Sequence, residues 1–103
     1  MQSQPAPQKG QPPERSIETA KALLSDGRAA DACLVLRDLL REVPDHEDAL
    51  YVFAVSLRYA GKFEGARATL NKLQQLRPAY GRAWQEQGHL ETCLLYTSDA
   101  ADE

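Results

Sequence analysis

The sequence predicts an all-α fold, an α-solenoid in which antiparallel helix pairs stack side by side. Three observations lead to this prediction: the chain repeats itself at a fixed offset, each copy has a glycine near its middle, and each has a proline near its end. The offset, called the repeat period below, is the separation in sequence between Ala20 and Ala54. An internal period of about 20–50 residues is the signature of stacked supersecondary units. Seven positions are identical between the two copies; the pairs are Ala20 and Ala54, Leu23 and Leu57, Gly27 and Gly61, Ala32 and Ala66, Leu36 and Leu70, Leu39 and Leu73, and Pro44 and Pro78.

The first pair of helices is expected at residues 16–26 and 29–42. Gly27 ends the first helix, because glycine accepts the left-handed conformation that terminates helices. Pro44 ends the second, because proline has no N–H and restricts the residue before it. Small and large apolar residues recur at helical spacing and give each helix one face for its partner; these residues are Ala20, Leu23, Ala32, Leu36, Leu39 and Val43.

The second pair is expected at residues 47–60 and 63–76, with Gly61 and Pro78 in the same two roles. Asp45 is expected to cap the first of these helices, since aspartate is among the preferred N-cap residues. The small residues matter as much as the leucines, because they let two helix axes approach closely where they cross.

A third unit begins near Gly81 with one more helix. Trp84 lies one repeat period after Leu50, at the same place in the unit. The third unit departs from the pattern at Gln87, where an apolar residue is expected. We expect residues 81–91 to be a truncated unit that contains its first helix alone.

These residues resemble the tetratricopeptide repeat, a helix-turn-helix of about 34 residues that has a small and a large residue in its first helix. Alanine, an aromatic residue or leucine, alanine and a final proline follow in and after the second helix. The resemblance covers residues 13–91, and the units are 13–46, 47–80 and, truncated, 81–91. Unit 47–80 has nearly every hallmark, namely Leu50, Phe53, Ala54, Leu57, Gly61, Phe63, Ala66, Leu70, Leu73 and Pro78. Unit 13–46 departs from the pattern at Ser16 and Thr19. The resemblance implies a tetratricopeptide-type α-solenoid that binds a peptide or protein segment on its concave face.

Both ends of the chain depart from the repeats. Residues 1–12 are expected to be disordered, because prolines and polar residues dominate them and no buried face is defined. Residues 93–103, CLLYTSDAADE, lack the glycine that the repeat period predicts at Leu95. They resemble a translation of the transposase mosaic-end adapter used in short-read library preparation. We therefore expect residues 92–103 to be a non-native tail and the chain to be the N-terminal part of a longer bacterial protein.

Composition argues against several classes of function. The net charge of −3 comes from Asp99, Asp102 and Glu103, because the other twelve acidic residues equal the twelve Lys and Arg in number. A neutral body offers no general attraction to nucleic acid or anionic membranes. No apolar run approaches the roughly 20 residues that span a bilayer, and no secretory signal precedes the repeats. We therefore expect a cytoplasmic protein that binds neither nucleic acid nor membrane.

No constellation of residues suggests catalysis, a metal or a cofactor. His89 and Cys93 lie four residues apart on an expected helix, but two ligands are too few for a metal site. Cys33 and Cys93 make neither a disulfide framework nor a zinc set, and Cys33 is interpreted as a small buried thiol. We expect no enzyme activity from these residues.

The first helix of each unit is expected to line the concave face. The candidate partner-binding residues are Lys21, Tyr51, Val55, Arg58, Tyr59, Arg82, Gln85 and His89. Tyr and Arg are the residue types that most often dominate binding energy at interfaces, and the alternative interpretation is ordinary solvated helix surface. The clamp by which some members of the family hold a terminal carboxylate is not expected, because Ile17, Lys21, Tyr51 and Val55 occupy its places.

Two alternatives remain open. The stretches LRYAGKFEGA and RAWQEQGHL resemble the repeat arm of bacterial repeat-containing sulfotransferases, whose cofactor is a phosphorylated adenosine sulfate donor. That resemblance implies an N-terminal arm of a larger enzyme. The other alternative is self-association through uncapped repeat ends, since about three or more repeats are needed for stability.

Overall fold

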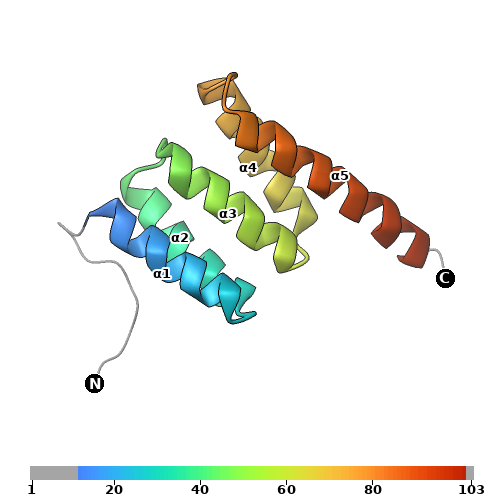
Figure 1. Cartoon of the computed structure of the whole chain (residues 1–103), viewed down its shortest axis with the longest axis horizontal. Coiled ribbons are helices and arrows are strands. Elements are labelled where there is room, and N and C mark those ends of the chain that lie inside the picture. The colour runs from blue at the N-terminus through green and yellow to red at the C-terminus, as the bar shows by residue number, and fades with distance from the viewer. Residues whose placement is uncertain (1–11, 102–103) are drawn as a thin grey trace.

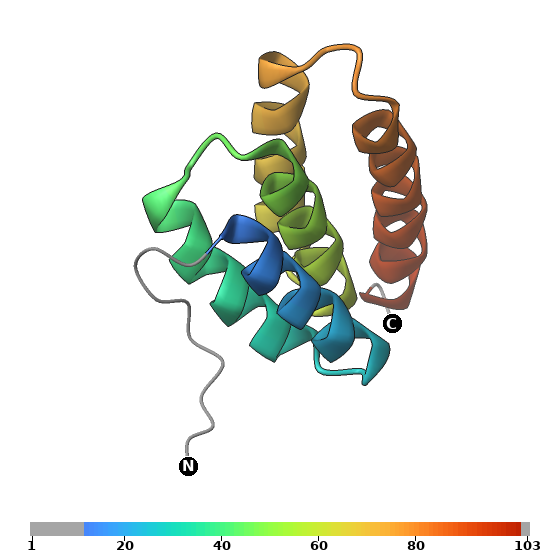
Figure 2. The same cartoon turned by 60° about the vertical axis from the view of Figure 1, so that its left-hand side comes forward.

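The computed structural model describes residues 12–101, with side chains described as far as Leu95. This part of the chain forms five helices: α1 (Pro13–Ser25), α2 (Ala29–Glu42), α3 (Glu47–Tyr59), α4 (Phe63–Leu76) and α5 (Gly81–Ala101). Helices α1, α3 and α5 form one layer, and α2 and α4 lie behind it (Figure 1). Figure 2 shows α5 at the end of the stack opposite the α1–α2 pair. The prediction of an all-α fold of stacked helix pairs is confirmed.

The helix bounds follow the expected ones with four differences. Helix α1 begins at Pro13, three residues earlier than expected, because proline suits the first position of a helix. Helix α1 ends at Ser25 and helix α3 at Tyr59, each one residue early. Helix α5 runs without a break past residue 92 to Ala101. The expected disorder of residues 1–12 falls, apart from Pro12, outside the described residues.

One glycine turns the chain between the two helices of each pair. Gly27 and Gly61 have φ of 78° and 81°, in the left-handed region that favours glycine. In each turn the amide of the next residue donates back to the helix: Arg28 N to the Leu23 carbonyl at 2.8 Å, and Lys62 N to Leu57 at 2.8 Å. These are the long hydrogen bonds of the Schellman motif, so both turns follow the same repeated design.

The expected cap of α3 is wrong. Helix α3 begins at Glu47, so the residue in the capping position is His46, whose Nδ1 accepts a hydrogen bond from Ala49 N at 3.2 Å. Asp45 lies one residue too early in the chain for this role. Its carboxylate instead lies 3.5 Å from Nζ of Lys72 on α4.

The core forms around the repeated small residues. Ala20, Ala32, Ala54 and Ala66 are completely buried. Around them pack two clusters of apolar side chains, one centred on the first unit and one on the second, and both include residues of the neighbouring unit. Because each cluster spans two units, the pairs depend on stacking for their burial.

One contact between stacked units changes from apolar to polar along the chain. Leu40 on α2 and Phe53 on α3 line a single apolar pocket. The residues one repeat period later are Gln74 on α4 and Gln87 on α5, and Gln74 Nε2 donates to Gln87 Oε1. Gln87, where an apolar residue is expected, therefore has a polar partner at the matching place.

Within residues 12–101, no helix combines the length and the apolarity needed to cross a membrane.

Candidate protein-binding groove

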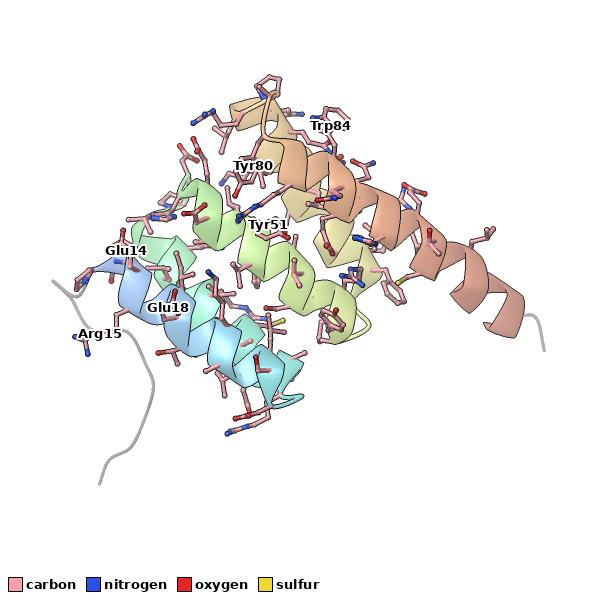
Figure 3. The ribbon with its side chains drawn as sticks, viewed as in Figure 1. Glu14, Arg15, Glu18, Tyr51, Tyr80 and Trp84 are labelled. Atoms are coloured by element: carbon pink, nitrogen blue, oxygen red, sulfur yellow. The ribbon has the colours of Figure 1, made fainter. Side chains whose placement is uncertain are left out.

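A groove runs across the layer of first helices. It encloses a cavity of about 120 Å³ between α1, α3 and α5, and α3 lies between the other two helices. Figure 3 shows Glu14 and Glu18 on α1, and Tyr51 on α3 with Tyr80 close to it. The lining residues are Glu14, Ile17, Glu18, Lys21, Asp48, Tyr51, Val52 and Arg82.

Three of the eight predicted partner-binding residues line this cavity: Lys21, Tyr51 and Arg82. The other five lie elsewhere on the first helices. Val55 is half-buried, and Gln85, His89 and Tyr59 are exposed. Arg58 is held inside the protein, as described below.

The sequence interpretation missed the acidic lining residues Glu14, Glu18 and Asp48. A signal for two of them was present. Asp48 lies one repeat period before Arg82, and Glu14 lies one period before Asp48, so the same place in each unit faces the groove. Counting back by the repeat period from the predicted Arg82 identifies both carboxylates.

Aromatic and charged side chains form a network where α3 and α5 begin. The rings of Tyr51 and Tyr80 pack edge to face, with centroids 6.1 Å apart and planes at 84°. The Arg82 guanidinium lies over the Tyr51 ring, 5.7 Å from its centroid. The Tyr80 hydroxyl donates to Asp48 Oδ1 at 3.1 Å. Tyr51 thus contacts both Tyr80 and Arg82 where α5 begins.

The environment of Tyr80 favours its neutral form. Burial raises the pKa of the Tyr80 hydroxyl above its usual value of 10.0, and the hydrogen bond to Asp48 and the charge of that carboxylate raise it further. A neutral hydroxyl keeps donating to Asp48, so the junction between α3 and α5 persists at neutral pH.

Arg58 forms a buried ion pair between α3 and α5. Its Nε and Nη2 both donate to the carboxylate of Glu86, with Nη2–Oε1 at 3.3 Å. The two side chains are 14% and 3% exposed. The guanidinium also lies 4.6 Å from the centroid of the Tyr59 ring. Arg58 therefore joins two first helices instead of presenting a free cation to a partner.

The pKa of Arg58 reflects this contact. Burial alone lowers the pKa of the guanidinium, but the hydrogen bond and the charge of Glu86 outweigh burial and raise the pKa above its usual value. The repeat-equivalent residues one unit earlier are Leu24 and Val52. Leu24 packs against the cluster that contains Val52, so this contact too changes from apolar to polar along the stack.

The described cysteines and acidic side chains offer no metal centre. Cys33 is buried, as interpreted from the sequence, and burial raises the pKa of its thiol. Among the residues that the structure describes, no group of three or more His, Cys, Asp or Glu side chains is placed to hold a metal ion.

The antiparallel helix pairs of this chain stack side by side and form a groove across their first helices. This arrangement places the chain in the class of helical-repeat proteins. The family model of the tetratricopeptide repeat matches residues 23–90. Since this match covers more than half of the chain, the chain belongs to the tetratricopeptide repeat family, and the resemblance seen in the sequence is confirmed. No curated protein and no solved structure matches the sequence.

Proposed function

We propose that this chain is a protein-interaction module that holds a peptide or protein segment in the groove of α1, α3 and α5. Tetratricopeptide repeats generally mediate protein–protein interaction. The single observation that carries the proposal is the cavity that all three first helices line, with Tyr51 and side chains of both charges among the lining residues.

The size of the cavity favours a side chain over a small molecule. Ligand pockets for small molecules and cofactors enclose about 300–1,000 Å³, whereas this cavity encloses about 120 Å³. That volume suits one anchoring side chain of an extended segment that continues along the groove. Its apolar part comes from Ile17 and Val52, and its polar part from charged side chains at the rim.

Tyr51 is the proposed anchor for the partner. It is half-buried, and its ring is restricted by the edge-to-face contact with Tyr80 and by the Arg82 guanidinium that lies over it. A restricted aromatic side chain loses little conformational entropy when a partner covers it, and such residues are enriched among those that dominate binding.

Selection from a random peptide display tests the proposal. Peptides are selected on the wild-type chain and then compared on Tyr51→Ala and on Arg37→Ala, a matched control at an exposed position on α2. The proposal predicts peptides that bind wild type and Arg37→Ala alike and bind Tyr51→Ala at least tenfold more weakly. Helical circular dichroism confirms that each variant is folded. If the selected peptides bind Tyr51→Ala as tightly as wild type, or if no peptide is selected, the proposal that the groove binds the partner is contradicted.

A second proposal concerns self-association at the α5 end of the stack. Trp84 is 54% exposed, whereas Leu50, its equivalent one unit earlier, is 4% exposed. Leu50 packs in the cluster with residues of α4, and within residues 12–101 no helix covers Trp84 in the same way. Sedimentation velocity tests whether a second copy covers it: a concentration-dependent dimer that Trp84→Gln abolishes supports the proposal, and a monomer at all concentrations overturns it.

The sulfotransferase alternative stays a prediction. It depends on two sequence stretches, and no described residue adds an argument for it. The coding sequence downstream of these repeats tests it directly, because a stop codon after the third or fourth repeat would exclude an attached catalytic domain.

A further inference from the structure

The groove has an ordered pattern of charge. Glu14, Asp48 and Arg82 occupy equivalent positions of the three units, each one repeat period after the last. Equivalent positions of stacked units lie in a row across the layer, so the row reads acid, acid, base from α1 to α5. Glu18 adds a carboxylate on α1, and Lys21, one turn further on, lies 3.7 Å from it. The groove is therefore acidic toward the start of α1 and basic toward α5.

Contacts inside the protein leave much of this charge available. Asp48 uses one carboxylate oxygen for the Tyr80 hydroxyl, and its other oxygen can accept a second donor. The Arg82 guanidinium lies over the Tyr51 ring, and because a guanidinium has five N–H donors, this contact leaves donors for a ligand. Among the described residues, no ion pair involves Glu14.

The pair of Glu18 and Lys21 does not cancel the acidic end. Both side chains are more than half exposed, at 73% and 53%. Exposed pairs of this kind are worth about 0–1 kcal/mol, so a ligand cation can replace Lys21 as the partner of Glu18 at little cost. Carboxylates on two neighbouring helices can then surround one basic side chain.

Resting on the proposed function, we propose that the groove selects an extended segment with a basic side chain and an acidic side chain about four residues apart, on the same face of the segment. The basic group lies between Glu14 and Asp48, and the acidic group pairs with Arg82. Packed helices lie about 8–10 Å apart, and an extended chain advances about 3.3 Å per residue. From a point between α1 and α3 to α5 is about one and a half helix spacings, which corresponds to about four residues. Side chains of an extended chain alternate between two faces, so the two charged side chains and the apolar side chain midway between them share one face, and the apolar side chain reaches the cavity beside Tyr51.

Three synthetic peptides test this selection by fluorescence anisotropy. Each has the same Gly/Ser flanks, an acetylated N-terminus and an amidated C-terminus, so that the peptides differ in their cores alone. The cores are Lys-Ala-Leu-Ala-Glu, Lys-Ala-Leu-Ala-Lys and Glu-Ala-Leu-Ala-Glu. The proposal predicts that the mixed-charge peptide binds wild type about three- to tenfold more tightly than either of the others, with an advantage that shrinks as salt is raised.

Charge reversal in the protein should exchange these preferences. Glu14→Lys with Glu18→Lys should favour the doubly acidic peptide, and Arg82→Glu should favour the doubly basic one. Glu14→Gln with Glu18→Gln removes the same charges without reversing them and should remove the advantage of the mixed peptide over the doubly acidic one. Glu64→Lys, an exposed position on α4 outside the groove, is the matched control and should change nothing.

The outcomes separate this inference from the proposed function. If the three peptides bind wild type equally, or none binds, or charge reversal leaves the preferences unchanged, the charge pattern does not select the ligand. Displayed peptides that still depend on Tyr51 but lack the charge pair would then keep the groove and remove this inference. Displayed peptides whose affinity does not change in Tyr51→Ala would contradict both the proposed function and this inference.

Discussion

The buried pair of Arg58 and Glu86 gives the sharpest prediction about stability. The two side chains are 14% and 3% exposed, and removing one partner of a buried ion pair costs about 3–5 kcal/mol because the other charge stays buried alone. We expect that cost for Arg58→Leu, which leaves the Glu86 carboxylate without its two donors. Glu86→Val should cost less, since the long Arg58 side chain can extend its charge toward water.

The double variant should recover most of the loss. Arg58→Leu with Glu86→Val installs the two residue types that the chain itself has at the equivalent places, Leu24 and Val52. Replacing a buried ion pair by apolar residues of similar volume is often neutral or stabilising by about 1–4 kcal/mol. The two substitutions should therefore be strongly non-additive, as expected for residues in direct contact.

Urea unfolding measures these differences with two probes. Far-ultraviolet circular dichroism follows the whole stack, and the fluorescence of Trp84, the single tryptophan of the chain, follows α5. The matched control is the more exposed pair of Arg77 and Glu47, whose side chains are 56% and 35% exposed. Arg77→Leu should cost at most about 1 kcal/mol. The reasoning fails if Arg58→Leu costs no more than Arg77→Leu, or if the double variant is as unstable as the sum of its two single substitutions.

Four further substitutions test the fold. Gly61→Ala should destabilise the fold by about 1–2 kcal/mol, because the φ of 81° at this position is strained for alanine. Gly88→Ala, at a position of α5 with open space around it, should instead stabilise the fold by up to about 1 kcal/mol. Equal effects of the two substitutions in urea unfolding would contradict the turn geometry. Ala66→Leu should cost about 1–3 kcal/mol by overpacking a completely buried position, and a melting temperature equal to that of wild type would show that the helices do not cross there. Burial and Asp48 raise the pKa of Tyr80, so its contribution to stability is present below pH of about 10 and is lost as pH rises through the raised pKa. In thermal melts at rising alkaline pH, Tyr80→Phe should therefore lose less stability than wild type, and parallel losses would show that the hydroxyl is not held by Asp48.

The repeat period explains why so much of the fold could be predicted. Pairs such as Ala20 and Ala54 must be small because two helices cross there, and Gly27 and Gly61 must take a conformation that other residues rarely adopt. These constraints act within one unit, so the sequence of that unit expresses them. Two copies of the same constraints leave few other ways to fold the chain.

Contacts between units were harder to predict. Arg58 lies on a first helix, at a place where an exposed groove residue is a reasonable expectation. Its partner Glu86 is 28 residues away, and the equivalent of Glu86 in the preceding unit is the apolar Val52. The period alone therefore indicates an apolar contact between these two places, like that of Leu24 and Val52. That both apolar residues are replaced by charged ones, Arg58 and Glu86, becomes visible once α3 and α5 are placed side by side.

The groove itself shows the same limit. The period identifies which positions face it, but not which side chains of neighbouring units meet. Tyr51 was predicted as a binding residue from its type, whereas its contact with Tyr80 depends on the turn that precedes α5. The cap of α3 was missed for a local reason, because histidine is an uncommon N-cap and Asp45 is only one residue away.

Chemical-shift mapping of the groove tests the central claim most directly. Amide spectra of the uniformly ¹⁵N-labelled chain are recorded as the tightest displayed peptide is added. The account predicts shifts concentrated on α1, α3 and the start of α5, around Ile17, Tyr51 and Arg82, with α2 and α4 little affected. Shifts concentrated instead on the pocket that α2 and α4 line on the other side of α3, around Leu40, Phe53 and Lys72, would contradict it.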